Sequence, residues 1–308
     1  MEALEFIKCP KKDSFNRLHL GMHYASYSTW AGFYIPDFPR QFNGNDDIEE
    51  NVVAPFVKAR CRTKKDVQGL LTLSLKDAVG DNVKVVEGGV DIALCSFFDD
   101  DDDFLSLIKK IVEKFEERID FRPELLIDAC DTIENLFEKA SYFLESGVFK
   151  SLSLSGAEAF LKKDLCQFKS IFDKATSLGI KKKAVSGEFC ESKSIVDLAK
   201  TLCLDEIQNA RSAADDEKTI AFLKKNDISL SVCPGSNVML GSAKSIKDIA
   251  LRRLFDEGVR FSIASDRLLL TGKSISEQCA ELVNSSVFSA SEIKEILQRS
   301  LDNSSDKD

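Results

Sequence analysis

The chain has 308 residues, a length typical of one α/β barrel, and its 44% hydrophobic content can bury a large core. A net charge of −9, an isoelectric point near 5.1 and the lack of any apolar run of roughly 18 residues exclude nucleic acid and membrane as main partners. The nine cysteines form no CxxC pair, and the N-terminal residues lack the pattern of a signal peptide. Both observations predict a cytoplasmic protein with free thiols.

Runs rich in β-forming residues alternate with helical patterns along the chain. The predicted strands are 13–20, 83–92, 124–130, 149–155, 180–186, 206–210, 229–234 and 260–266. Apolar residues at helical spacing predict helices at 103–118, 163–179, 215–227 and 247–258, the first with Asp103 as its N-cap. Eight right-handed βαβ units close into a (β/α)8 TIM barrel. An open doubly wound sheet would need a glycine-rich phosphate turn, and no GxGxxG occurs.

The chain shows no linker or internal repeat, so we expect a single domain over 1–308. The long stretch 21–62 follows the first strand and contains Trp30, so we expect an insertion over one barrel mouth. The polar tail 302–308 is expected to fray. Homo- and hetero-oligomers both remain open.

Seven segments, each at the end of a predicted strand, carry a resemblance to one family. They are "PKKDSFNRLHLGM" (10–22), "FRPELLI" (121–127), "SLSGAE" (153–158), "VSGEF" (185–189), "EIQNA" (206–210), "CPGSNV" (233–238) and "SIASDRLLL" (262–270). In this order they resemble the motifs of the adenosine deaminase family, within the metal-dependent hydrolase (amidohydrolase) superfamily. In a TIM barrel the chemistry lies at the C-terminal ends of the strands, where these segments fall.

The resemblance implies a role for several retained positions. Glu188 matches the glutamate that donates a proton to the purine, and Asp266 matches the last zinc ligand. Gly156 matches a glycine that contacts the substrate. Asn209 stands where the family has the histidine that orients the attacking water. Arg267 replaces an aspartate that contacts the purine, and it favours an anionic ligand over a purine ring nitrogen.

The other ligand positions have changed. The resemblance places Phe15, Arg17 and Val185 where the family has zinc-binding histidines. Phe and Val have no lone pair to offer, and Arg stays charged at any ordinary pH. We therefore expect an inactive pseudoenzyme without a cofactor, which binds a nucleoside or an anionic small molecule or serves as a scaffold. Arg17 is expected to pair with Asp266, and Phe15 and Val185 to fill the barrel interior.

Two enzymatic alternatives remain. An active adenosine deaminase would need zinc in a rebuilt site around His19, His23, Asp266 and Glu188. In the predicted strand 13–20, His19 lies on the same face as Phe15 and Arg17, because the period of a strand is two. A metal-free reaction would use Glu188 and Asp266 as acid and base. Separately, the run Asp99–Asp103 is compatible with a cation site but is typical of a solvated loop or helix start.

Overall fold

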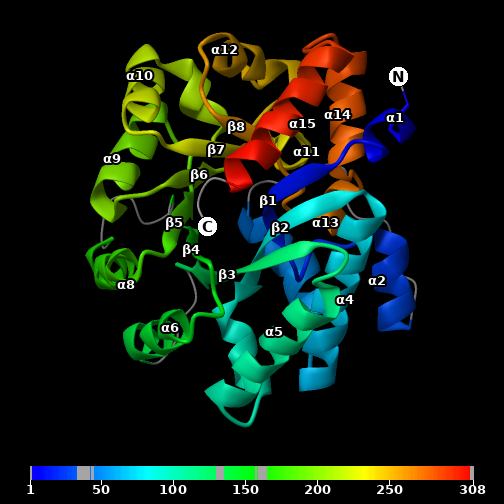
Figure 1. Ribbon diagram of the computed structural model, residues 1–308, viewed down its shortest axis with the longest axis vertical. Coiled ribbons are helices and arrows are strands. Elements are labelled where there is room, and N and C mark those ends of the chain that lie inside the picture. The colour runs from blue at the N-terminus through cyan, green and yellow to red at the C-terminus, as the bar shows by residue number, and fades with distance from the viewer. Residues whose placement is uncertain are drawn as a thin grey trace.

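The computed structural model describes residues 2–32, 42, 45–129, 135–156, 158 and 165–305. It confirms the predicted (β/α)8 barrel, with the strands at the centre and the helices around them (Figure 1). The strands are β1 (Lys11–Arg17), β2 (Val83–Asp91), β3 (Asp120–Asp128), β4 (Ser151–Ser155), β5 (Lys181–Val185), β6 (Glu206–Gln208), β7 (Ser229–Val232) and β8 (Phe261–Ile263). Neighbouring strands are parallel and follow chain order.

The barrel closes between β1 and β8, just beyond the end of β8. The Arg17 amide donates to the Asp266 carbonyl at 3.1 Å, and the Asp266 amide donates to the Phe15 carbonyl at 2.9 Å. These bonds form a parallel bridge between Asn16 and Asp266. Closure therefore places the last residues of β1 beside the loop that follows β8.

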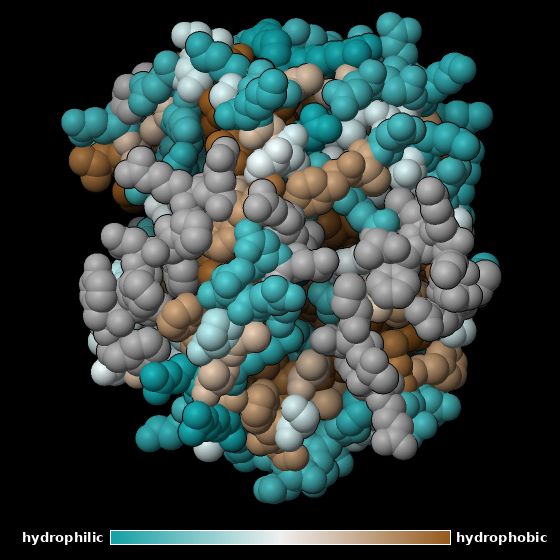
Figure 2. Space-filling model, turned by 180° about the vertical axis from the view of Figure 1, so that it is seen from behind, coloured by the Kyte–Doolittle hydropathy of each residue, from teal (hydrophilic) through white to brown (hydrophobic). Residues whose placement is uncertain are grey.

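Helices cover the outside of the barrel. They are α1 (Leu4–Ile7), α2 (Tyr24–Ala31), α3 (Asn45–Ile48), the π-helix η1 (Glu49–Lys58), α4 (Lys64–Gly80), η2 (Ile92–Phe97), α5 (Asp101–Phe115), α6 (Leu136–Glu145), α8 (Cys166–Ser177), α9 (Ser192–Leu202), η3 (Arg211–Asp215), α10 (Glu217–Lys225), α11 (Pro234–Met239), η4 (Ile246–Asp248), α12 (Leu251–Asp256), α13 (Leu268–Thr271), α14 (Ile275–Asn284) and α15 (Ala290–Ser305). Seen from behind, hydrophilic residues predominate along the upper and lower edges, and apolar residues are visible both in hollows and at the surface (Figure 2). In the described part of the chain, every helix is too short or too polar to span a membrane.

Two sequence predictions of local structure were wrong. The N-cap of α5 is Asp100, whose side chain accepts a hydrogen bond from the Asp103 amide, so the helix begins earlier than expected. Strand β1 ends at Arg17 and not at residue 20, because residues 18–20 form a turn. His19 therefore does not share a strand face with Arg17.

The segment 21–62 contains α2, α3 and η1, and its residues 33–41 and 43–44 lie outside the described part of the chain. The Phe42 amide donates to the carbonyl of Met239, the last residue of α11, at 2.8 Å. At the other terminus α15 continues to Ser305, so most of the segment 302–308 is helical. The placement of 21–62 over a barrel mouth stays a prediction.

Candidate active site

The candidate site is built from residues at the C-terminal ends of five strands. Arg17 and Val185 are the last residues of β1 and β5, and Ser155 is the last of β4. Asn209 follows β6, and Asp266 lies three residues beyond β8. The parallel barrel brings these ends to one rim, although the residues span about 250 positions of the chain.

Asn209 and Asp266 share a backbone feature that aims their side chains. Their φ angles are 62° and 52°, in the left-handed region. Asn and Asp enter this region more easily than other residues with a side chain, because their short polar groups can bond locally. The chain thus turns sharply at both strand ends, with an amide and a carboxylate at the turning points.

An ion pair occupies the centre of the site and confirms the predicted partner of Arg17. The Arg17 Nε lies 3.0 Å from the Asp266 Oδ1, and the two side chains are 7% and 0% exposed. The Arg17 guanidinium also donates to the Ser155 hydroxyl at 3.0 Å and lies 5.2 Å from the centre of the Phe15 ring. A buried carboxylate needs such compensation, and here a guanidinium provides it.

Apolar side chains fill the space beside this ion pair. Phe15, Val185, Cys233 and Ala264 form a cluster of their own, separate from the main core, and all are at most 3% exposed. Phe15 and Val185 thus fill the interior, as the sequence predicted. Burial raises the pKa of the Cys233 thiol well above its usual range, so this thiol keeps its proton at neutral pH.

This set of residues does not fit zinc. A catalytic zinc takes three protein ligands with lone pairs and keeps one open position. Phe15 and Val185 offer no donor atom, and Arg17 brings a positive charge to the one retained carboxylate, Asp266. Within the described ranges, no group of three or more His, Cys, Asp or Glu residues is arranged to hold a metal ion.

In the described part of the chain, neither histidine of the rebuilt-site hypothesis is arranged with Asp266 to hold a metal ion. His23 precedes α2, and its backbone amide donates to Asp77 of α4 at 2.7 Å, on the helical layer outside the barrel. His19 lies in the turn after β1, and burial, with Arg17 nearby, lowers its pKa to about 3. The described structure does not bring His19, His23 and Asp266 together as a ligand set.

Glu188 and Asn209, the two predicted catalytic residues, are in direct contact. The Asn209 Nδ2 donates to the Glu188 Oε1 at 2.6 Å and lies 3.4 Å from the Asp266 Oδ2. The Asn237 amide in turn donates to the Asn209 Oδ1 at 3.2 Å. Burial raises the pKa of Glu188 to about 7; Arg267 opposes this rise, and the Asp266 charge adds to it. Glu188 can therefore hold or release a proton near neutral pH.

The two predicted substrate-binding positions lie at the same rim. Gly156 follows β4 with a φ of 70°, a conformation that a side chain would disfavour. Arg267 is 4% exposed, and its Nε lies 3.9 Å from the Asp266 Oδ2. Burial alone would lower the pKa of Arg267, but Asp266 and Glu188 raise it. Two arginines therefore flank Asp266.

Sequence reasoning assigned no role to Glu158, which fixes the loop that carries Glu188. Its carboxylate accepts hydrogen bonds from the Glu188 amide at 2.8 Å and the Phe189 amide at 3.0 Å, and also from the Gly187 amide. Glu158 ends the quoted motif "SLSGAE", and Asn237 lies within "CPGSNV". Both could have been noticed as polar residues inside a family motif.

The aspartate run has a structural use. Asp100 caps α5, while Asp101 pairs with Lys139 of α6 at 2.9 Å and Asp103 pairs with Lys64 of α4. These carboxylates therefore interact favourably with the positive end of the α5 dipole and link α5 to α4 and α6.

Comparisons with known proteins agree with this architecture. A family model described as adenosine deaminase matches residues 101–307. A protein of Treponema pallidum (strain Nichols), called a putative adenosine/adenine deaminase, is 33% identical over 286 residues, which cover 92% of this chain and 95% of that protein.

Solved structures share the fold at low identity. An adenine deaminase from Arthrobacter aurescens superposes with a TM-score of 0.84 at 17% identity, over 97% of this chain and 95% of that one. The arabidopsis ADAL complexed with GMP gives a TM-score of 0.78 at 16% identity, over 97% and 93%. The family match and the similarity over nearly the full length show that this chain belongs to the adenosine deaminase family.

Proposed function

We propose that this protein is a family member that binds a purine nucleoside or nucleotide without zinc and does not hydrolyse it. One observation carries the proposal: the Arg17 Nε lies 3.0 Å from the Asp266 Oδ1. By the family resemblance, Arg17 stands at the position of a zinc-binding histidine, and Asp266 at that of the zinc-binding aspartate. The guanidinium supplies the positive charge that the carboxylate needs but cannot polarise a water molecule into a nucleophile.

The choice of ligand class rests on residues kept around the ion pair. Gly156, Glu188 and Arg267 remain at the rim, and protonated Glu188 can donate a hydrogen bond to a ring nitrogen near neutral pH. Arg267 adds a cation suited to a phosphate or carboxylate. Related proteins are described as acting on adenosine or adenine, and one similar structure contains GMP.

An active deaminase is the second candidate, favoured by the relatives' names and by the contact between Glu188 and Asn209. One experiment separates the two. The purified chain is analysed for zinc by mass spectrometry, assayed for conversion of adenosine to inosine with added zinc, and titrated with adenosine and AMP by calorimetry in the presence of EDTA.

The proposal expects saturable binding in EDTA, no turnover and far less than one zinc per chain. One tightly bound zinc together with inosine formation would overturn it in favour of the deaminase. If neither ligand binds, the binding role is wrong and a scaffold remains.

A further inference from the structure

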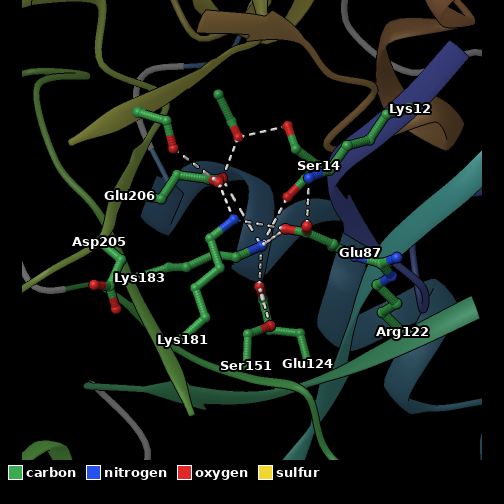
Figure 3. A network of polar contacts seen from close by, with 12 residues as sticks. Lys12, Ser14, Glu87, Arg122, Glu124, Ser151, Lys181, Lys183, Asp205 and Glu206 are labelled. Carbon is green, nitrogen blue, oxygen red and sulfur yellow. Dashed lines mark hydrogen bonds and ion pairs between the residues drawn. The ribbon is translucent and has the colours of Figure 1, made fainter. Parts of the chain in front are cut away.

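The opposite end of the barrel has an unusual interior. In the first half and the middle of the strands, six charged side chains meet, here called the barrel floor: Lys12, Glu87, Glu124, Lys181, Lys183 and Glu206. They come from β1, β2, β3, β5 and β6, and Figure 3 shows them directed toward one another. Ser14 and Ser231 join the network across the barrel by a hydrogen bond of 2.6 Å.

The centre of the barrel floor is Lys183, which is fully buried. Its Nζ lies 2.7 Å from the Glu124 Oε2 and 3.8 Å from the Glu206 Oε1, and it also contacts Glu87. Burial alone would lower the pKa of Lys183, but the three carboxylates raise it. Three lysines thus meet three glutamates, and their formal charges balance.

Stability alone does not account for this arrangement. The interior of a TIM barrel is normally filled by branched apolar side chains. Removing a charge from water costs several kcal/mol, and well-packed apolar residues can replace buried ion pairs without loss. Charged residues at this place are expected if they contact a polar ligand or solvent in a cavity.

A cavity of about 940 Å³ opens onto the barrel floor. Lys12, Glu87, Lys181 and Glu206 line its inner end, and its walls include aromatic rings and aliphatic side chains, among them Phe121, Phe149, Phe261, Leu144 and Leu230. Its volume lies within the roughly 300–1,000 Å³ of small-molecule sites. The cavity thus combines a polar end with apolar walls.

Cations are enriched around this cavity. Six Lys and Arg residues and five Asp and Glu residues line it, in a chain with 42 Lys and Arg against 51 Asp and Glu. Arg122 and Arg260 pair with Asp120 and Asp227, whose side chains are 50% and 74% exposed. Exposed pairs contribute about 0–1 kcal/mol, so an incoming anion can replace the aspartates at little cost.

From these observations we propose a second binding site, at the N-terminal end of the barrel, for a small organic anion with an apolar body. The anionic group lies among Arg122, Arg260 and Lys181, and the apolar body lies against the three phenylalanines. The site is separate from the C-terminal rim and does not depend on the function proposed there.

The test uses anilinonaphthalene sulfonate, an aromatic anion whose fluorescence rises in apolar sites, with the full-length chain. The double variant Arg122→Ala/Arg260→Ala removes two cavity cations, their ion pairs with Asp120 and Asp227, and the hydrogen bond from Arg260 to the Asp227 carbonyl. Its melting temperature is compared with that of the wild type to verify that the variant folds. The control, Lys65→Ala/Lys193→Ala, removes two exposed cations near the opposite barrel end and gives the same net charge.

We expect saturable binding by the wild type, a dissociation constant raised about 10-fold in the cavity variant, and a change below about twofold in the control. A crystal soaked with the probe should show it against Phe121. The proposal is overturned if the wild type shows no saturable binding, if both double variants weaken binding equally, or if adenosine displaces the probe from the C-terminal rim.

Discussion

The ion pair between Arg17 and Asp266 yields the sharpest prediction. Replacing Arg17 by Met keeps most of the side-chain volume but leaves a fully buried carboxylate without its main partner. Breaking a buried pair in this way costs about 3–5 kcal/mol. Because the Arg267 Nε lies 3.9 Å from the other carboxylate oxygen, we expect the lower end, a loss of about 3 kcal/mol in the free energy of unfolding.

The assay is urea denaturation followed by circular dichroism for the wild type, Arg17→Met, Asp266→Asn and the double variant. Asn is the matched replacement, since it tolerates the positive φ at position 266. The double variant should be more stable than the sum of the single losses implies, by about 2 kcal/mol. Additive losses would refute the idea that the guanidinium compensates this carboxylate.

Three further predictions concern nearby residues and α5. The pKa of Glu188 is raised from 4.5 to about 7, so its contribution to folding is fully present below pH 4.5, and about 3 kcal/mol of the free energy of unfolding is lost as the pH rises to 7. The variant Glu188→Gln should therefore gain stability over the wild type as the pH rises, measured by denaturation across this range. A difference that stays constant with pH would contradict the raised pKa. Gly187→Ala should lower stability by about 1–3 kcal/mol, because φ is 90° and the new Cβ would lie 2.6 Å from Ile195; an unchanged melting temperature would show that the loop adjusts freely. Asp100→Ala should lower the free energy of unfolding by about 1 kcal/mol, and Asp103→Ala by about half as much, both measured by thermal denaturation. The reverse order would place the N-cap at Asp103.

The sequence was sufficient for the architecture and for the placement of the candidate residues at strand ends. Alternating strand and helix patterns predict βαβ units, and eight such units have one common closed form, so local periodicity determined the barrel. The order of the motifs then assigned Phe15, Arg17, Val185, Asn209 and Asp266 to strand ends. Their chemistry follows from residue type alone: a phenyl ring or an isopropyl group cannot ligate a metal in any fold.

Local sequence was less decisive where several residues were equivalent. In the run Asp99–Asp103 each aspartate can cap a helix, and the position of α5 against its neighbours selects Asp100. Strand β1 ends at Arg17 because residues 18–20 form a turn, in which the Leu20 amide donates to the Arg17 carbonyl at 2.7 Å, and no pattern within residues 13–20 reveals that limit.

Long-range partners were decided by the tertiary structure. Arg17 and Asp266 are 249 positions apart, and the cluster of Phe15, Val185, Cys233 and Ala264 unites four strand ends. The charged barrel floor around Lys183 was not predicted, because the sequence alone indicates that a lysine in a short strand faces solvent. Side-chain type determines what a residue can do, whereas barrel closure determines which residues from distant strands share one space, and that depends on the register of the whole sheet.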